Sequence, residues 1–358
     1  MNQAHSIRVS ILIPVYNGSA TLTDCLEALF RNDLSEAEVI LINDHSTDDG
    51  PAIAARMGAR VLDNPRGRGP AAARNFGAEN AKGQILFFVD ADVVVKDNTV
   101  SEVLQAFDEA PQIAAVFGSY DDDPAQKNFL SQYKNLLHHY VHQRSTENAS
   151  TFWAGCGAIR KEVFRSMAGF DELQYTKAQI EDIELGVRLW KKGHIVRLRK
   201  SLQVKHLKRW TPIGLLKADI LYRAIPWSKL ILQDRRMPSE LNLLPAHRWS
   251  AFLVGLLLLA LVILPFAYFE FGISGWGFKA LLLSIPFILI LLIWLNRDLY
   301  GFFLSRRGFL FTVAAIFWHL FYYFYSGVTF VICWFYYKLR KSPPLKSSYN
   351  KKDAVELN

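Results

Sequence analysis

Short apolar runs alternate with amphipathic stretches over the first 120 residues. The runs have the length and branched-residue content of buried strands, and the stretches between them repeat apolar residues at helical spacing. This alternation predicts βαβ units around a mostly parallel sheet with helices on both faces, which is an α/β fold. The predicted strands are 9–15, 38–43, 59–63, 84–89 and 113–120, and the predicted helices are 19–31, 48–57 and 70–81.

The next part of the chain has fewer but longer elements. Residues 127–144 and 180–192 have the spacing of helices, and Gly193 ends the second one as a C-terminal cap. An apolar stretch that contains glycines covers 151–159, and an apolar–basic strand covers 201–205.

The composition changes abruptly at about Trp249, after which Leu, Ile, Phe, Tyr and Trp dominate. Residues 251–269 carry no charge, 277–295 carry only Lys279, and 308–337 have His319 as their only ionisable group of note. A helix needs about 20 apolar residues to cross a bilayer. The pattern therefore predicts an α-helical membrane region with about three transmembrane helices.

Residues 211–232 join the two parts and mix apolar side chains with Lys217, Arg223 and Lys229. This mixture is typical of an amphipathic helix in the lipid headgroup layer, although a surface helix of the soluble domain has the same pattern. The predicted organisation is a catalytic domain at 1–210, an interfacial helix and linker at 211–248, transmembrane helices at 249–337 and a basic polar tail at 338–358.

The net charge of the 358 residues is +8, and the basic residues concentrate beside the membrane segments. Basic residues there favour the anionic cytoplasmic leaflet, so the charge indicates a membrane partner and no nucleic acid. No secretory signal pattern precedes the first strand, and Cys25, Cys156 and Cys333 have neither disulfide nor zinc spacing. We therefore expect a multi-pass protein of the cell membrane with a cytoplasmic soluble domain.

Three simple spans conflict with the charge distribution. They would put the basic residues of 338–352 on the side opposite the soluble domain. The positive-inside rule favours that tail, and the predicted loop with Arg297, Arg306 and Arg307, on the cytoplasmic side.

Acidic side chains follow the predicted strands at the edge where parallel α/β sheets bind ligands. Asp90 and Asp92 flank one small residue directly after a fully apolar strand. Two carboxylates in this position fit a hard cation such as Mg²⁺ or Mn²⁺ that also binds substrate phosphates. His206, at the end of the apolar–basic strand, is a further candidate for the metal or for a phosphate contact.

Polar residues at neighbouring strand ends are candidates for binding a nucleotide. The first strand ends in Pro14, Tyr16 and Asn17, and Asp44 closes the second, where its carboxylate can accept hydrogen bonds from a base or a ribose. The small-residue loop 67–75 enters a helix and allows close approach of a nucleotide, and its Arg74 is suited to phosphates or to the base.

Glu181 and Asp182 begin the predicted helix at 180–192. The positive end of a helix dipole lowers carboxylate pKa values, so we expect this pair to stay ionised. An ionised carboxylate is what a general base requires.

In order along the chain, these segments resemble the family 2 glycosyltransferases. The opening SILIPVYN at 10–17, the NDHSTD at 43–48 and the ARNFG at 73–77 resemble family motifs, the second with Asn43 and His45 in place of Asp and Gly. Asp90-Ala91-Asp92 resembles the metal-binding DxD, and HLKRW at 206–210 resembles a QxxRW element with His in place of Gln.

The resemblance implies a GT-A fold, which is a Rossmann-like mixed sheet that binds a nucleoside-diphosphate sugar. It implies inverting transfer that depends on a divalent metal, with Asp182 as the catalytic base and Glu181 beside it. On the acceptor side it implies the loop with Trp153 and Gly155, together with Arg209 and Trp210. An interfacial helix directly after such a domain suggests a lipid acceptor, either a polyprenyl phosphate or a glycolipid at the cytoplasmic leaflet.

Three other functions fit parts of the pattern. A processive polysaccharide synthase would need a translocation channel, for which three spans are few. A non-catalytic transferase-like assembly module would not need intact Asp90, Asp92 and Asp182. A dinucleotide-dependent oxidoreductase would have its glycine fingerprint after the first strand, whereas Gly67-Arg68-Gly69 follows the third.

Overall fold

A computed structural model describes residues 6–233 and 245–340, with no side-chain description for Arg340. The described chain divides into two compact units, which meet between Leu215 and Leu216.

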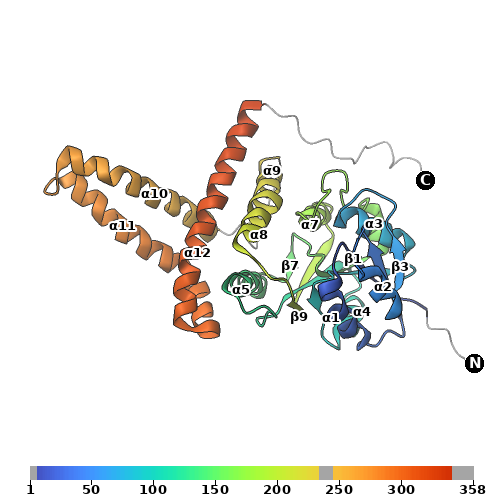
Figure 1. Cartoon of the computed structure of the whole chain (residues 1–358). Helices are drawn as coiled ribbons and strands as arrows, with labels where there is room; N and C mark the ends of the chain where they lie inside the picture. The colour runs from blue at the N-terminus through green and yellow to red at the C-terminus, as the bar shows by residue number, and fades with distance from the viewer. Residues whose placement is uncertain (1–5, 234–244, 341–358) are drawn as a thin grey trace, which may run out of the picture. The chain divides into compact units, whose positions relative to one another are not determined.

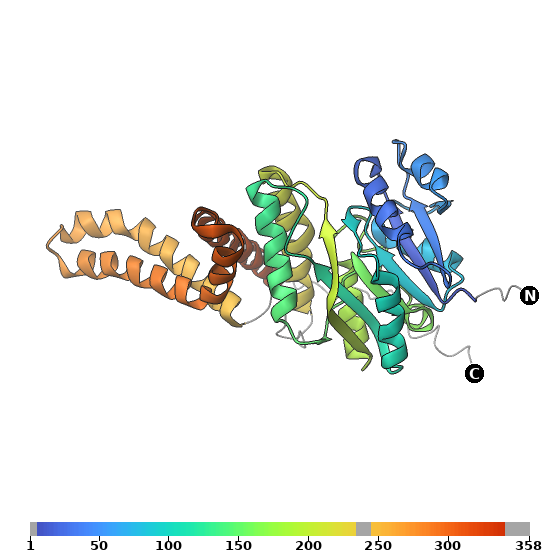
Figure 2. The same cartoon turned by 90° about the horizontal axis from the view of Figure 1, so that it is seen from below.

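The first unit is an α/β domain built on one mixed sheet (Figures 1 and 2). Its described strands run in the order β3-β2-β1-β4-β8-β6-β9-β5, and β7 pairs with β9. The strands are β1 (Val9–Val15), β2 (Ala37–Asn43), β3 (Arg60–Asp63), β4 (Ile85–Val89), β5 (Val93–Val94), β6 (Ile113–Tyr120), β7 (Asn148–Ala149), β8 (Cys156–Arg160) and β9 (Ile195–His206). The helices are α1 (Ser19–Phe30), α2 (Gly50–Arg56), α3 (Pro70–Asn80), α4 (Thr99–Glu109), α5 (Phe129–Arg144), α6 (Lys161–Ser166), α7 (Glu181–Lys191) and α8 (Pro212–Lys217).

The sheet is parallel in its first half and mixed in its second. β1 pairs in parallel with β2 and β4, and β2 with β3. β8 inserts antiparallel between β4 and β6, and the long β9 then pairs in parallel with β6. The α/β class with a mixed sheet is therefore confirmed.

Both faces of the sheet are buried because successive side chains of a strand point to opposite sides. Ile11 and Ile13 of β1 face a core with α1 and α4, whereas Leu12 faces a second core with α3 and α7. All three are completely buried. This two-sided burial explains why the central strands are apolar without alternation.

The structure differs from the predicted elements in several places of the first unit. The short strands β5 and β7 were not predicted. Helices α4 and α6 were not predicted. β9 extends from Ile195 to His206, although only 201–205 was predicted, because the residues before Ser201 continue the same alternation of buried and exposed side chains. β8 covers only the end of the predicted stretch 151–159.

The second unit is helical throughout its described residues. It contains the π-helix η1 (Ala218–Ala224), α9 (Ile225–Gln233), α10 (Pro245–Phe271), α11 (Trp276–Leu295) and α12 (Arg297–Arg340). Among the described helices, α10, α11 and α12 are long and apolar enough to cross a membrane. The helix expected over 211–232 is present as α8, η1 and α9. Of the rest of the expected segment 211–248, residues 234–244 lie outside the described residues, and 245–248 begin α10.

The prediction of a loop at Arg297, Arg306 and Arg307 was wrong. These residues form the first part of α12, which bends at Gly308, where φ is 80°. The ring centroids of Phe303 and Phe311, on either side of the bend, lie 5.8 Å apart. The first turns of α12 were missed because the arginines interrupt the apolar run, but Phe303 is completely buried and holds them in place.

Candidate functional site

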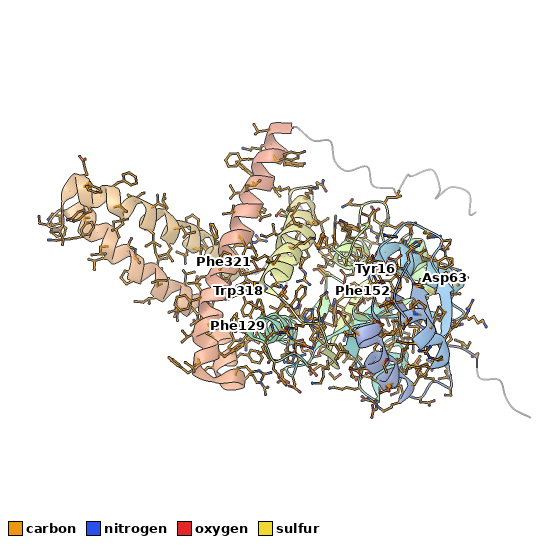
Figure 3. The ribbon with its side chains drawn as sticks, in the orientation of Figure 1. Tyr16, Asp63, Phe129, Phe152, Trp318 and Phe321 are labelled. Carbon is orange, nitrogen blue, oxygen red and sulfur yellow. The ribbon has the colours of Figure 1, made fainter. Side chains whose placement is uncertain are left out.

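The loops that follow β1 and β2 are joined by hydrogen bonds at the carboxyl edge of the sheet. The Oδ1 atom of Asn17 accepts the backbone N–H of Thr47 at 2.8 Å and its hydroxyl at 3.2 Å. The backbone N–H of Ser19, at the start of α1, donates to the carboxylate of Asp48 at 2.8 Å. These bonds fix the two loops as one rim, on which Tyr16 is exposed (Figure 3). Pro14 lies half-buried in β1, just before the rim.

His45 lies in this rim with a φ angle of 64°, in the left-handed region that glycine adopts most easily. Its Nε2 atom lies 3.1 Å from the carbonyl oxygen of Arg66. The family motif has glycine at this position, and the left-handed backbone explains that preference. His45 adopts the same backbone conformation.

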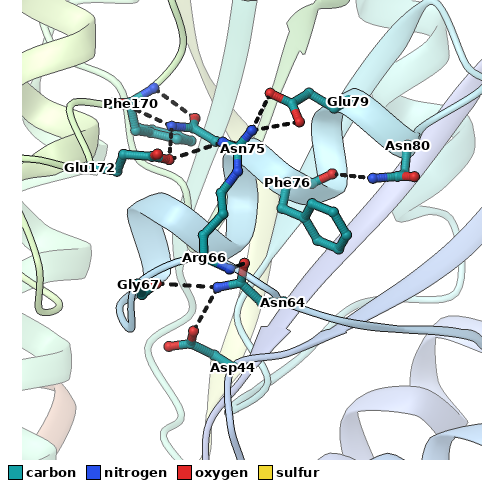
Figure 4. Close-up of polar contacts among 10 residues, drawn as sticks. All are labelled: Asp44, Asn64, Arg66, Gly67, Asn75, Phe76, Glu79, Asn80, Phe170 and Glu172. Carbon is teal, nitrogen blue, oxygen red and sulfur yellow. Dashed lines mark hydrogen bonds and ion pairs between the residues drawn. The ribbon is translucent and has the colours of Figure 1, made fainter.

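Asp44 is buried, and both of its oxygens are bound by protein groups. Figure 4 shows the bond from Asn64. Oδ1 accepts from the side chain of Asn64 at 2.9 Å, and Oδ2 accepts from the backbone N–H of Gly69 at 2.7 Å. Gly69 has a φ of 128°, and a Cβ atom there would lie 2.6 Å from the carbonyl oxygen of Thr176. Asp44 therefore holds the loop before α3 close to β2, and Asn64 and Gly69 orient its carboxylate.

Arg74 of α3 joins two carboxylates from distant parts of the chain. Its Nη1 donates to Glu181 at 2.8 Å and its Nη2 donates to Asp90 at 2.7 Å. Burial lowers the pKa of Arg74, but the charges of Asp90 and Glu181 raise it above its ordinary value. The guanidinium is buried and ionised, so Arg74 sets the separation between the end of β4 and the start of α7.

Asn75, the next residue, holds the loop before α7 (Figure 4). Its amide accepts from the backbone N–H of Phe170 and donates to the carbonyl of the same residue, both at 2.9 Å. It also donates to Glu172 at 2.9 Å. The Phe170 ring lies 5.7 Å from the Arg74 guanidinium, so this loop also packs against the charged group.

Asp182 lies beside this cluster at the start of α7. Its carboxylate accepts the backbone N–H of Ala154 at 3.0 Å and that of Ile183 at 2.8 Å. Burial raises the pKa of Asp182 and the neighbouring Glu181 raises it further, so that it reaches about 7 despite these bonds and the charge of Arg74.

The expectation that the helix dipole keeps the pKa of Asp182 low was wrong. Burial and the adjacent carboxylate of Glu181 outweigh the dipole. A pKa near neutrality is nevertheless the value that makes a carboxylate an efficient general base.

Asp92 lies near two basic side chains at the other end of the DxD segment. Its Oδ2 is 3.8 Å from Nε2 of His206 and 4.0 Å from Nζ of Lys208. Burial raises the pKa of Asp92, but the His206 ring and then Lys208 lower it more, so the net shift is downward. The His206 ring stacks on Tyr120 with centroids 4.1 Å apart, which fixes its orientation toward the carboxylate.

The donor atoms near Asp90 and Asp92 fit a hard divalent cation. The side chains of Asp90 and Asp92 are 31% and 29% exposed, so protein does not enclose either of them, and His206 adds a ring nitrogen. Among the described residues, no group of three or more His, Cys, Asp or Glu side chains is arranged to hold a metal by itself. A cation here would therefore take part of its coordination from substrate oxygens, as Mg²⁺ usually does.

The residues expected on the acceptor side lie in two different environments. The half-buried ring of Trp153 covers Gly155, where a Cβ atom would lie 2.5 Å from the indole. Trp210 is buried, and its backbone N–H donates to the Ser131 hydroxyl at 2.8 Å, whereas Arg209 is exposed. Trp210 thus anchors the chain to α5, and Trp153 lies directly before the backbone N–H that binds Asp182.

Three features of the site were not predicted from the sequence. Tyr120 stacks on His206, the backbone N–H of Ala154 binds Asp182, and Asn64 binds Asp44. Tyr120 ends β6 and Asn64 follows β3, so the strand-end rule that drew attention to Asp90 also applied to them. The donor at Ala154 is a backbone N–H, which every residue except proline has, so the sequence could not indicate it.

An α/β sheet that gathers carboxylates and one buried arginine at its carboxyl edge is typical of a domain that binds phosphate-containing ligands. The family model described as "Glycosyl transferase family 2" matches residues 10–167. Over these residues the chain is therefore similar to the family 2 glycosyltransferases.

Curated relatives are similar to about a third of the chain. Glycosyltransferase GlyG of Streptococcus pneumoniae serotype 4 (strain ATCC BAA-334 / TIGR4) is 30% identical over 126 residues, 34% of this chain and 42% of the relative. Putative glycosyltransferase EpsH of Bacillus subtilis (strain 168) is 32% identical over 120 residues, 32% of this chain and 35% of the relative. The chain thus spans less than half of the length of these relatives.

One solved structure matches most of the chain. It is the mannosyltransferase PcManGT from Pyrobaculum calidifontis in complex with GDP-Man and Mn²⁺, at 16% identity and a TM-score of 0.48. The match covers 94% of this chain and 88% of that protein.

Replacing Arg74 by Ala should lower the free energy of unfolding by about 3–5 kcal/mol, because two carboxylates would lose a buried partner. The matched control is Arg60→Ala, which removes an arginine that is 43% exposed and pairs with Glu38 at 3.6 Å. Such a surface pair is worth about 0–1 kcal/mol. Denaturant unfolding of both purified variants measures the difference, and equal losses would contradict the central role of Arg74.

Proposed function

We propose that the protein transfers a sugar from a nucleoside-diphosphate sugar to a lipid acceptor at the cytoplasmic leaflet of a membrane, with inversion at the anomeric carbon. The observation that carries the proposal is the position of Asp182, a carboxylate with a pKa near 7, beside the cluster of Arg74, Asp90 and Glu181. The similarity to family 2 glycosyltransferases supports the transfer of a sugar, and the apolar helices that follow support an acceptor in the membrane.

The nucleotide would bind at the rim of β1 and β2. Pro14, Tyr16 and Asn17 border this rim, and Asp44 orients the loop before α3. The acidic segment Asp90–Asp92 after β4 would then face the diphosphate. The sugar would extend from the diphosphate toward the start of α7.

Asp90 and Asp92, with His206, would hold a Mg²⁺ or Mn²⁺ ion against the diphosphate. Such an ion neutralises charge that develops on the leaving group, an effect of several kcal/mol. The partial exposure of the two aspartate side chains supports this role.

Asp182 would accept the proton of the attacking hydroxyl. As the acceptor oxygen forms its bond to the anomeric carbon, the bond from that carbon to the diphosphate breaks, and the nucleoside diphosphate leaves. Burial and the adjacent Glu181, which Arg74 holds in place, raise the pKa of Asp182, and the charge of Arg74 lowers it only in part. The carboxylate is thus basic enough to take a proton at neutral pH.

The rest of the chain supports a lipid acceptor. Trp153 and Arg209 are the proposed acceptor contacts, and α8 begins directly after Trp210. A lipid whose polar end carries a phosphate or a hydroxyl fits a domain that is followed at once by an amphipathic helix and then by apolar helices. A polyprenyl phosphate and a glycolipid both have this chemistry.

The direct test is a screen of nucleoside-diphosphate sugars with the purified full chain. We expect release of nucleoside diphosphate from one of them when Mn²⁺ and a membrane lipid extract are present, and loss of that release with a chelator. The control replaces the lipid extract by water-soluble sugar acceptors. Equal transfer to soluble acceptors would contradict the lipid acceptor, and activity in excess chelator would contradict the metal.

Asp182→Asn should reduce transfer by about 100-fold or more, because the amide cannot accept the acceptor proton. Binding of the nucleoside diphosphate, measured by calorimetry, should remain nearly unchanged. The matched control is Asp97→Asn, which removes a carboxylate that is 71% exposed and should leave transfer intact. Lost nucleotide binding in the Asp182 variant would exclude the role as base.

The rate of transfer to a hydroxyl acceptor should depend on pH through Asp182. Its pKa is raised to about 7, so the active, ionised form is lost as the pH falls below that value. We expect the rate constant at saturating substrates to decrease about tenfold for each pH unit below 7 and to level off above it. A rate that increases on acidification would assign the base to another group.

A further inference from the structure

We infer that α12 lies in the membrane–water interface together with η1 and α9, and that α10 and α11 are the transmembrane hairpin of this region. The lipid surface is then the partner of α12, although its composition alone would allow it to cross the bilayer. The inference rests on which residues lie beside one another inside the second unit, and it does not depend on the proposed reaction.

The helix pair η1–α9 runs alongside the middle of α12. Asp219 of η1 is buried, and its Oδ2 accepts the hydroxyl of Tyr325 at 2.8 Å. Two turns further on, Ser228 of α9 lies beside Cys333. The offsets from Asp219 to Ser228 and from Tyr325 to Cys333 are nearly equal, so the two helices are parallel neighbours over this length, and they also lie side by side in Figure 1.

This pairing gives both helices the same depth. Arg223 of η1 pairs with Asp219 at 3.0 Å and has a side chain that is 47% exposed, and Lys229 follows on α9. If α12 crossed the bilayer, Tyr325 would lie close to the middle of its uncharged stretch 309–337, and the ion pair of Asp219 and Arg223 would lie within the hydrocarbon core. Charged groups there are costly, whereas they are normal at the headgroup layer.

The contacts between α12 and the hairpin of α10 and α11 also place the middle of α12 at the level of the membrane surface. Tyr323 lies 2.9 Å from the ring of His247, in the first turn of α10, and donates to Asn296, directly after α11, at 2.8 Å. Gly327 lies against Ala251. The middle of α12 therefore crosses the open end of the hairpin, where α10 begins and α11 ends (Figure 1). For a hairpin that spans the membrane, that end is at the surface.

The composition of α12 also fits the interface. Fourteen of the 29 residues in 309–337 are Phe, Trp or Tyr, compared with four of the 20 in α11. Trp and Tyr are enriched at membrane–water interfaces. The exposed stripe of α12 recurs every seven residues, and it consists of Leu310, Phe317, Phe324 and Val331. The stripe is the surface that would face the acyl chains.

Two spans also remove the conflict with the positive-inside rule. With α12 in the interface, Arg306, Arg307 and Lys338 stay on the side of the catalytic domain, as the rule favours. With α12 as a third span, Lys338 would lie on the opposite side.

The first experiment measures sidedness in sealed vesicles that contain the full chain. In a Cys333→Ala background, Lys338→Cys and Ser274→Cys are labelled with a membrane-impermeant maleimide. Ser274 lies between α10 and α11, so it marks the far side, and Asp97→Cys marks the side of the catalytic domain. We expect Lys338→Cys to react from the same side as Asp97→Cys, whereas reaction from the Ser274 side would overturn the inference. Labelling in detergent controls for thiol reactivity.

The second experiment measures depth with nitroxide labels at positions 310, 317, 324 and 331, one at a time, in liposomes. All four should have the same depth to within about one helical turn, ~5 Å. A helix that crosses the bilayer would separate the first and last label by about 30 Å along its axis. A depth gradient of that size would overturn the inference even if the sidedness labels failed to react.

Discussion

The guanidinium of Arg74 is the group on which the arrangement of the site depends. It is buried, and it binds Asp90 after β4 and Glu181 at the start of α7. A buried charge needs partners to offset its desolvation, and the two carboxylates are the partners of Arg74 here. The pKa of Asp182 depends on this cluster, because the Glu181 that pairs with Arg74 also raises the pKa of Asp182.

Much of the fold was predictable because it depends on local patterns. Strands β1, β2 and β4 are buried on both faces, and their continuous apolar sequences indicated this directly. Helix α4 was missed although Val100, Val103 and Phe107 have helical spacing and are buried. The sequence therefore contained the pattern of α4. The bend of α12 at Gly308, in contrast, depends on packing between residues on its two sides.

The site was predictable residue by residue, but its pairings were not. The end of each strand identified Asp44, Asp90 and Asp92 as candidates, since parallel strands bring their carboxyl ends to one edge. Arg74 and Glu181 are separated by 107 positions, and no local pattern connects them. The error on the pKa of Asp182 has the same origin, because the helix dipole is visible in the sequence but burial against distant segments is not.

The side chain of Asn75 has a consequence for how the domain tolerates change. Its amide pairs with both the N–H and the carbonyl of Phe170, as a neighbouring strand would. An aspartate of the same shape would turn an acceptor toward that carbonyl and toward Glu172, so the loop before α7 would be repelled where it is now held. The chemical identity of this one amide therefore matters more than its size, because it lets a helix and a loop recognise each other through main-chain groups that every sequence shares.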